Sequence, residues 1–319
     1  MRGNWIAAAI LIGVAGAEAR AQPAFVQVGE IAGPVDVVRA EGAMVYASAG
    51  RTLTVYDVAD PSAPRQRGSY TFPQEIWSFR VAGSVVYAGV NFYGLGVLDV
   101  SDPATPALRS AFKTRGQAKT GAVFGTRAIV VDHMEGLVLV DLSTPAVPTS
   151  PGAFFVDGYA RDVTTVGRHA FAVDSPTGFY VLDLSKADPL EPVASVQSGA
   201  ALRALEVEGS LAVLVGGGAL HPFDVTNPAA PVKHPPFRTP GGALHVALQG
   251  RRALVADQRA GLQVVDLSSP AAPVVVGTFK TGGVARHVAA SGDLVFVVVA
   301  KEGAKPQDGG RIVILKERR

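Results

Sequence analysis

The chain has 319 residues, of which 48% are hydrophobic and 18% charged, and its formal net charge at pH 7 is +2. A charge this close to neutral gives no indication of binding to nucleic acid or to an anionic membrane. The absence of cysteine excludes a disulfide framework, a thiolate nucleophile and a lipid-modified cysteine. The 36 glycines and 22 prolines are typical of many short strands joined by tight turns.

Residues 1–21 have the features of a secretory signal peptide. Arg2 precedes an apolar run at residues 5–15, and the small-x-small sequence Ala-Arg-Ala at residues 19–21 ends the segment. The run is too short for a bilayer, which takes roughly 20 apolar residues. We therefore expect export to the periplasm or the cell surface, and no membrane span in a mature chain of residues 22–319. An uncleaved anchor is the alternative.

The rest of the chain repeats with a period of about 42 residues. One copy, GLVLVDLSTPAVP, occupies residues 136–148 and has an aspartate near its centre. This aspartate returns at intervals of 41 or 42 residues, at Asp57, Asp99, Asp141, Asp183, Asp224 and Asp266. A seventh copy, GRIVILKER, has Leu315 at the same position. Such a period, with several short strands in each copy, is typical of the blades of a β-propeller.

Each copy predicts four strands. In the first copy we expect them at residues 37–41, 44–48, 52–58 and 65–71. The apolar run before each marker aspartate does not alternate, which fits a strand covered on both faces by neighbouring blades. A glycine marks each turn between the first and second strands, at Gly42, Gly83, Gly125, Gly167, Gly209, Gly250 and Gly292. The residue four positions later is large and apolar, which predicts a ladder of core side chains.

The two ends of the repeat predict how the ring closes. Residues 24–33 match the outermost strand of a blade, yet no marker aspartate precedes them. The last copy has three strands and lacks a fourth, and its second hairpin is lengthened within residues 300–310. We therefore expect a single all-β domain, a seven-bladed β-propeller with four-stranded blades, in which the N-terminal strand completes the last blade.

The copies GLVLVDLS, GLQVVDLS, GLGVLDVS and GFYVLDLS, most of them followed by Pro-x-x-Pro, resemble the LVIVD-repeat family of exported bacterial and archaeal proteins. The resemblance covers essentially the whole chain after residue 21. It implies a β-propeller in the periplasm or at the cell surface, and no catalytic motif that could be transferred. The fifth copy, with three glycines at residues 216–218, departs from the pattern.

The residue six positions before each turn glycine is expected at the mouth of the central channel, and four of these seven residues are basic. They are Asp36, Trp77, Lys119, Arg161, Arg203, Leu244 and Arg286, with His245 and His287 one position further on. A converging ring of cations would attract an anionic small molecule, an oligosaccharide or an acidic protein segment. The candidate ligand-binding residues are Lys119, Arg161, Arg203, His245, Arg286 and Trp77. The alternative is that these charges are only solvated in the channel and partly neutralised by Asp36 and Asp162.

Asp132, His133 and Glu135, in a hairpin on the same face, are weaker candidates for binding a divalent metal. A solvated polar turn is the preferred interpretation of these residues, because no other His or carboxylate cluster is placed to complete a metal site. No Gly-x-Ser-x-Gly, His-Glu-x-x-His or P-loop sequence occurs, so the sequence predicts no catalytic residue and no cofactor. We therefore expect a monomeric binding or scaffold module. A periplasmic metal-dependent hydrolase of the lactonase type and a purely structural surface protein are the alternatives.

Overall fold

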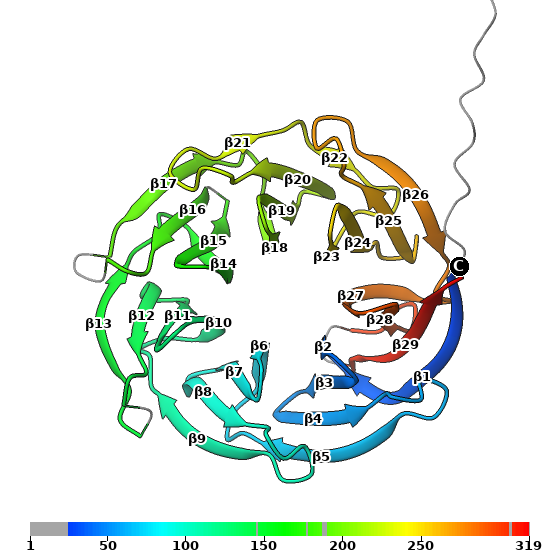
Figure 1. Cartoon of the computed structure of the whole chain (residues 1–319), viewed down its shortest axis with the longest axis horizontal. Helices are drawn as coiled ribbons and strands as arrows, with labels where there is room; N and C mark the ends of the chain where they lie inside the picture. Colours follow the sequence, from blue (N-terminus) through cyan, green and yellow to red (C-terminus); the bar gives the residue numbers. More distant parts are fainter. Residues whose placement is uncertain (1–24, 145, 177, 187–189, 306–307, 319) are drawn as a thin grey trace, which may run out of the picture.

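The computed structural model describes residues 25–318 except 145, 177, 187–189 and 306–307 (Figure 1). The expected signal peptide lies outside the described residues. Seven antiparallel sheets stand around a central channel. The chain is therefore a seven-bladed β-propeller, as the repeat predicted. In each blade the strands are called a to d, from the channel outward.

Blade 1 contains β2 (Val37–Glu41), β3 (Met44–Ala49), β4 (Thr52–Asp57) and β5 (Arg65–Thr71). Blade 2 contains β6 (Ile76–Ala82), β7 (Val85–Val90), β8 (Gly94–Asp99) and β9 (Ala107–Phe112). Blade 3 contains β10 (Ala118–Phe124), β11 (Arg127–Asp132), β12 (Gly136–Asp141) and β13 (Thr149–Phe154). Blade 4 contains β14 (Tyr159–Val166), β15 (His169–Ser175), β16 (Gly178–Asp183) and β17 (Pro192–Gln197).

Blade 5 contains β18 (Leu202–Glu208), β19 (Leu211–Gly216), β20 (Ala219–Asp224), β21 (Val232–Lys233) and β22 (Phe237–Arg238). Blade 6 contains β23 (His245–Gln249), β24 (Arg252–Ala256), β25 (Leu262–Asp266) and β26 (Val274–Phe279). Blade 7 contains β27 (Val284–Ser291), β28 (Leu294–Ala300), β29 (Gly310–Glu317) and, from the other end of the chain, β1 (Phe25–Val35).

The ring closes through the N-terminal strand, as predicted. β1 pairs antiparallel with β29, from Phe25 opposite Glu317 to Val35 opposite Gly310, and the order in this sheet is β1-β29-β28-β27. In Figure 1 the blue first strand lies against the red last strand. The two ends of the chain are thus joined by backbone hydrogen bonds in one sheet, which resists opening of the ring.

Blade 5 has a broken outer strand. Its d position is divided into β21 and β22, and both short pieces pair with β20. Pro235 and Pro236 lie between the two pieces. Proline cannot donate a hydrogen bond to a ladder, so it interrupts pairing at this edge. The departure of the fifth copy from the repeat therefore changes only the outermost strand.

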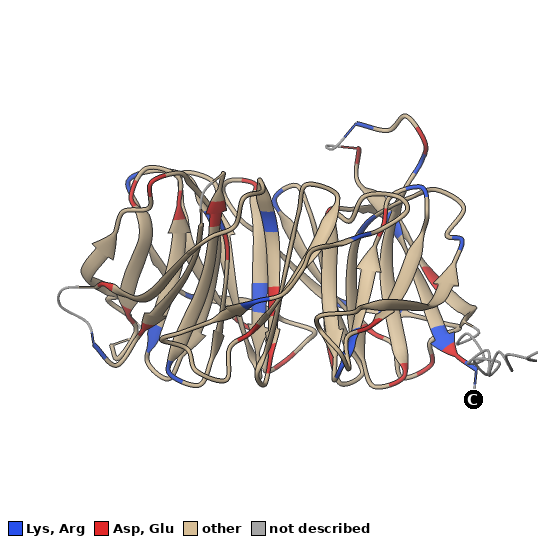
Figure 2. Cartoon of the chain, turned by 90° about the horizontal axis from the view of Figure 1, so that it is seen from above, with Lys and Arg blue, Asp and Glu red and all other residues tan. Residues whose placement is uncertain are grey.

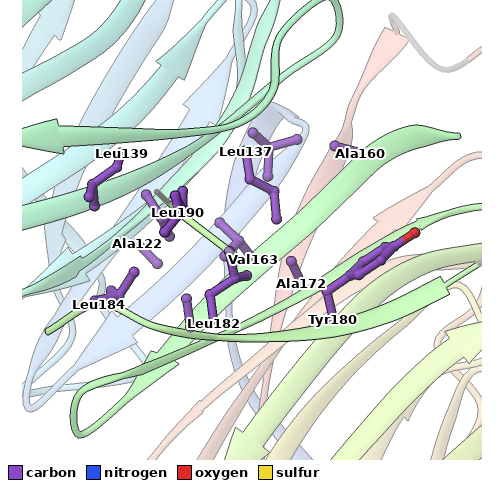
Figure 3. Close-up of a cluster of buried hydrophobic side chains, with 13 residues drawn as sticks. Ala122, Leu137, Leu139, Ala160, Val163, Ala172, Tyr180, Leu182, Leu184 and Leu190 are labelled. Carbon is purple, nitrogen blue, oxygen red and sulfur yellow. The ribbon is translucent and has the colours of Figure 1, made fainter. Parts of the chain in front are cut away.

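The hydrophobic core consists of clusters between neighbouring blades. Figure 3 shows the cluster in which Leu137 and Leu139 of β12 pack with Val163 of β14 and Leu182 of β16. All four side chains are fully buried. The predicted ladder belongs to these clusters, since Ile129, Phe171 and Phe296 are buried as expected. Tyr87 also packs against one of these clusters, but it is only half-buried and lines a cavity of the channel.

The disc has two different faces. The a–b and c–d turns lie on one face, and the b–c hairpins and d–a connections lie on the other, which we call the mouth face. The b–c hairpin of blade 7, between β28 and β29, stands above the rest of the disc (Figure 2).

Candidate functional site

In five blades, the residue expected at the channel mouth is the extra residue of a β-bulge in the a strand. In blade 2, Ile76 pairs with Val90 and Ser78 pairs with Gly89, so Trp77 has no partner in the ladder. The same interruption occurs at Lys119, Arg161, Arg203 and Arg286. A bulge redirects a side chain and is common beside functional sites. The pairing of blades 1 and 6 has no such interruption.

A buried aspartate at the end of the b strand fixes the approach to the mouth in three blades. Each of these carboxylates accepts a hydrogen bond from a glycine N–H in the preceding d–a connection. The pairs are Asp132 with Gly116 at 3.1 Å, Asp174 with Gly158 at 3.0 Å, and Asp257 with Gly241 at 2.9 Å. A Cβ atom on Gly116 would lie 2.6 Å from Asp132 Oδ1, so the close approach requires glycine. Lys119 and Arg161 follow three residues after their glycines.

A cavity of about 560 Å³ opens at this end of the channel. Four of its lining residues are at bulges on consecutive blades: Trp77, Lys119, Arg161 and Arg203. Arg161 and Arg203 are exposed and make no hydrogen bond or ion pair within the part of the chain that the structure describes. We call these four side chains the basic mouth.

Lys119 belongs to the basic mouth but has partners. Its Nζ lies 3.2 Å from the centre of the Trp77 ring and donates a hydrogen bond of 3.1 Å to Gln117 Oε1. Burial and the nearby Arg161 guanidinium lower the pKa of Lys119. The ammonium therefore anchors the indole beside the two arginines.

Three of the seven residues expected at the mouth, Asp36, Leu244 and Arg286, do not line this cavity. Arg286 Nη1 donates to the carbonyl of Lys305 at 3.1 Å, and its Nη2 donates to the carbonyl of Ala304 at 2.6 Å. The lengthened hairpin of blade 7 thus holds this guanidinium. The Asp36 carboxylate accepts the N–H of Gly50 at 2.9 Å and so caps the b–c hairpin of blade 1.

His245 lines the cavity as a buried neutral ring. Its imidazole stacks on that of His287, with the ring centres 3.5 Å apart. Burial and the positive charge of Arg39 lower the pKa of His245 well below its usual value, and burial, His245 and Arg39 do the same for His287. His245 therefore adds no positive charge to the mouth at neutral pH.

Below the mouth lies an ionic group that the sequence analysis did not identify. Arg80 Nη1 donates to Glu206 Oε1 at 2.5 Å, and its Nη2 lies 3.3 Å from Asp162 Oδ1. Although burial lowers it, these two carboxylates raise the pKa of Arg80 above its usual value. Asp162 also accepts the N–H of Leu205 at 3.1 Å. Its charge is thus committed inside the channel and does not neutralise the mouth.

A second channel arginine has no carboxylate partner. Arg39 Nη1 lies 3.0 Å from His287 Nε2 and 3.5 Å from His245 Nε2, and because a guanidinium can only donate, both nitrogens accept. Burial and the charge of Arg80 lower the pKa of Arg39 to about 10. Arg39 also lines a cavity of about 490 Å³ at the other end of the channel. The mid-channel group of Arg39, Arg80, Asp162 and Glu206 therefore separates the two cavities.

The sequence contained a signal for this group. Arg39, Arg80 and Glu206 lie three positions before their turn glycines, whereas the expected mouth residues lie six positions before them. The equivalent residues in the other blades are Ala122, Thr164, Ala247 and Ala289. Alignment at this second offset would have shown three charged residues in a ring of small ones.

The candidate metal ligands are engaged in other contacts. The Asp132 carboxylate accepts the N–H groups of Gly116, Met134 and Glu135. Glu135 pairs with Arg115 at 3.3 Å, and the His133 ring stacks on Tyr159 at 4.9 Å. Within the described residues, no three His, Asp or Glu side chains converge as metal ligands.

The described residues contain no helix that is long and apolar enough to cross a membrane.

The fold is similar to that of solved β-propellers. Against the β-propeller domain of Cps50 (Swd1) from Myceliophteria thermophila, the TM-score is 0.75 at 13% identity, covering 92% of this chain and 99% of that one. The WD40 domain of Pan2 from Neurospora crassa gives 0.72 at 13% identity, covering 95% and 97%. The designed protein Ika8 gives 0.63 at 8% identity, covering 91% and 99%.

Comparison with curated proteins finds no matching sequence. The family model of the LVIVD repeat matches five segments, at residues 32–72, 75–114, 115–154, 157–193 and 240–281. These segments cover blades 1 to 4 and blade 6. The unmatched blades are blade 5, with its broken outer strand, and blade 7, which is assembled from both ends of the chain. Since the matches cover more than half of the sequence, the chain belongs to the LVIVD-repeat family.

Proposed function

We propose that this propeller is a binding or scaffold module that engages an anionic ligand or an acidic protein segment at the basic mouth. The observation that carries the proposal is the state of Arg161 and Arg203. Both are exposed at the rim of a cavity, on adjacent blades, without a hydrogen bond or ion pair to any described residue. Guanidinium groups bind carboxylates and phosphates through paired hydrogen bonds, so two free ones suit an anion.

The charges around the cavity support an anionic ligand. The lining residues include the cations Lys119, Arg161 and Arg203, and the one acidic residue among them is Asp162. That carboxylate is bound to Arg80, and burial keeps the two histidines neutral. The mouth is therefore a positive hollow in a chain that is close to neutral overall. The hydrolase alternative has no comparable support, because Asp132 is occupied by backbone N–H groups.

We also propose that the protein is exported, on the basis of the sequence features of residues 1–21. Cleavage after the Ala-Arg-Ala sequence would leave Gln22 at the N-terminus. N-terminal sequencing of protein recovered from the periplasmic fraction or the culture medium of a bacterial host tests this. Protein found only in the cytoplasm with Met1 retained would contradict it.

The binding proposal is tested by a thermal-shift screen of the purified protein. The probes are citrate, inorganic phosphate, uronic acid oligosaccharides and hexaglutamate. A ligand at about 100 times its Kd stabilises a protein by about 2.7 kcal/mol, which is a measurable shift. We expect at least one probe to raise the melting temperature of the wild type and to have no effect on Arg161→Gln/Arg203→Gln.

The matched control removes the same charge elsewhere. Arg65 and Arg238 are exposed on outer strands. The variant Arg65→Gln/Arg238→Gln should keep the anion response of the wild type. Equal responses from the wild type and both variants would show that the mouth arginines do not bind the anion.

A further inference from the structure

Exposed aromatic side chains gather on the mouth face over blades 2 to 4. Five aromatic residues of the described chain are strongly exposed: Trp77, Phe92, Phe124, Phe155 and Tyr159. Phe124 lies at an a–b turn on the opposite face, whereas the other four lie in bulges, b–c hairpins or d–a connections. Met134, which is 65% exposed, lies on the mouth face as well. Single exposed apolar residues are ordinary, but a grouping on one face marks an interaction surface.

Phe92 and Met134 occupy equivalent positions at the tips of neighbouring b–c hairpins. Each lies two residues after the b strand of its blade, β7 for Phe92 and β11 for Met134. Phe92 has φ +50°, a region that favours glycine. The b–c hairpin of blade 5 has Gly217 at its tip. An aromatic side chain is thus held outward at a tip where glycine would be easier to place.

Phe155 and Tyr159 flank the next connection around the ring. Phe155 follows directly after β13, and Tyr159 is the first residue of β14. Their exposed fractions are 67% and 53%. We call Phe92, Met134, Phe155 and Tyr159 the apolar sector.

Contacts in the structure link the apolar sector to the basic mouth. The Tyr159 ring stacks on His133, which precedes Met134. The side chain of Met134 lies against Gly116, in the connection that leads to Lys119. Tyr159 is also two residues before Arg161 on the same strand. Apolar side chains of blades 3 and 4 therefore lie close to Lys119 of blade 3 and Arg161 of blade 4.

We propose that the apolar sector and the basic mouth together bind one segment of a partner protein in which acidic and large apolar residues are interspersed. This inference rests on the proposed function of the mouth and specifies the class of ligand. Carboxylates of the segment bind Arg161 and Arg203, and its apolar side chains cover Met134, Phe155, Tyr159 and Phe92. Aromatic residues and arginine are enriched where binding energy concentrates in protein interfaces. A peptide fits this arrangement better than a bilayer, because the cations line a hollow rather than a flat surface.

The test compares two fluorescent 12-residue peptides in anisotropy titrations with the whole protein. One alternates glutamate with leucine and phenylalanine, and the other alternates glutamate with serine. We expect the wild type to bind the first at least tenfold more tightly. The variant Met134→Ser/Phe155→Ser should lose this preference while its affinity for the Glu–Ser peptide is unchanged. Both side chains are mostly exposed, and an unchanged melting temperature confirms that the variant is folded.

The matched control is Phe124→Ser/Val147→Ser, which removes two exposed apolar side chains from the opposite face of blade 3. It should bind both peptides as the wild type does. Equal affinity of the wild type for the two peptides would overturn this inference and leave the proposed anion site intact. By contrast, Arg161→Gln/Arg203→Gln binding the Glu–Ser peptide like the wild type would overturn the proposed function itself.

A titration with lipid vesicles tests whether the apolar sector binds a membrane surface instead of a peptide. Vesicles of phosphatidylcholine with phosphatidylglycerol are titrated under the same conditions. Binding to these vesicles that depends on Met134 and Phe155, without a preference between the peptides, would show that the sector meets a membrane surface and would overturn the peptide proposal. Absence of vesicle binding together with the peptide preference supports it.

Discussion

The inner strands carry positive charge at two levels, and the two levels differ in how that charge is satisfied. In the middle of the channel, Arg80 binds Glu206 and Asp162. At the mouth, Arg161 and Arg203 have no ion pair or hydrogen bond among the described residues. In this channel, the charged residues that are candidates for binding a ligand are therefore those that the fold leaves without a partner.

The two arginines in the middle of the channel also differ in their partners. Arg80 and Arg39 occupy equivalent positions three residues before Gly83 and Gly42. The first is held by two carboxylates, whereas the second contacts two neutral imidazoles. Removing the first breaks both ion pairs of the channel carboxylates, whereas removing the second breaks no ion pair.

The largest expected effect is therefore that of Arg80→Met. It leaves the carboxylates of Asp162 and Glu206 in the channel without their cation, which typically costs about 3–5 kcal/mol. Urea unfolding measures the loss. Arg39→Met is the matched control, and we expect it to cost less than Arg80→Met, because Arg39 is hydrogen-bonded to neutral imidazoles and not to a carboxylate. Equal losses in the two variants would contradict the distinction between them.

The next largest effect on stability is expected at Asp132, whose buried carboxylate holds the backbone next to the basic mouth. In Asp132→Asn, one oxygen becomes an NH₂ group that can no longer accept a backbone N–H, so a buried donor is left unsatisfied. We expect the free energy of unfolding in urea to fall by about 2–3 kcal/mol. We also expect weaker anion binding, because Asp132 holds the d–a connection at Gly116 that leads to Lys119. Asp157→Asn, an exposed change in the next d–a connection, should leave both properties unchanged.

The stacked histidines predict a dependence of stability on pH. Their folded pKa values lie well below the usual 6.5, so below pH 6.5 the unfolded chain takes up protons that the folded chain does not. Stability is therefore complete above pH 6.5 and falls on acidification. Between pH 7 and pH 5.5 we therefore expect the free energy of unfolding to decrease. The variant His245→Gln/His287→Gln should lack this part of the loss, and an identical pH profile would exclude the stack as its source.

Much of the fold was predictable because every blade repeats the same local signals. The four strands of blade 1 begin where the sequence placed them and end within one residue of the expected positions. The closing strand was equally predictable, because a fourth strand without a preceding copy has only the last blade to pair with. The outer strand of blade 5 was not, since Pro235 and Pro236 lie in a segment where the repeat itself fades.

The position of the candidate site was predictable from the sequence, but the burial and the contacts of its side chains were not. The offset from the turn glycines located Lys119, Arg161 and Arg203 at one cavity. It could not show that His245 is buried against His287, or that the blade 7 hairpin holds Arg286. These contacts join blades or loops that are distant in the sequence. The repeat predicts where a residue lies in its blade. It does not predict which side chain of another blade or loop that residue contacts.

Binding at the mouth arginines is tested most directly by urea unfolding of the wild type and Arg161→Gln/Arg203→Gln, each with and without the Glu–Leu/Phe peptide. Without peptide, we predict equal stability within about 0.5 kcal/mol, because these arginines hold nothing in the folded chain. With peptide at about 100 times its Kd, the wild type should gain about 2.7 kcal/mol and the variant should gain nothing. A variant that is already destabilised without peptide would show that the mouth arginines are structural, and a variant that gains as much as the wild type would show that they do not bind the peptide.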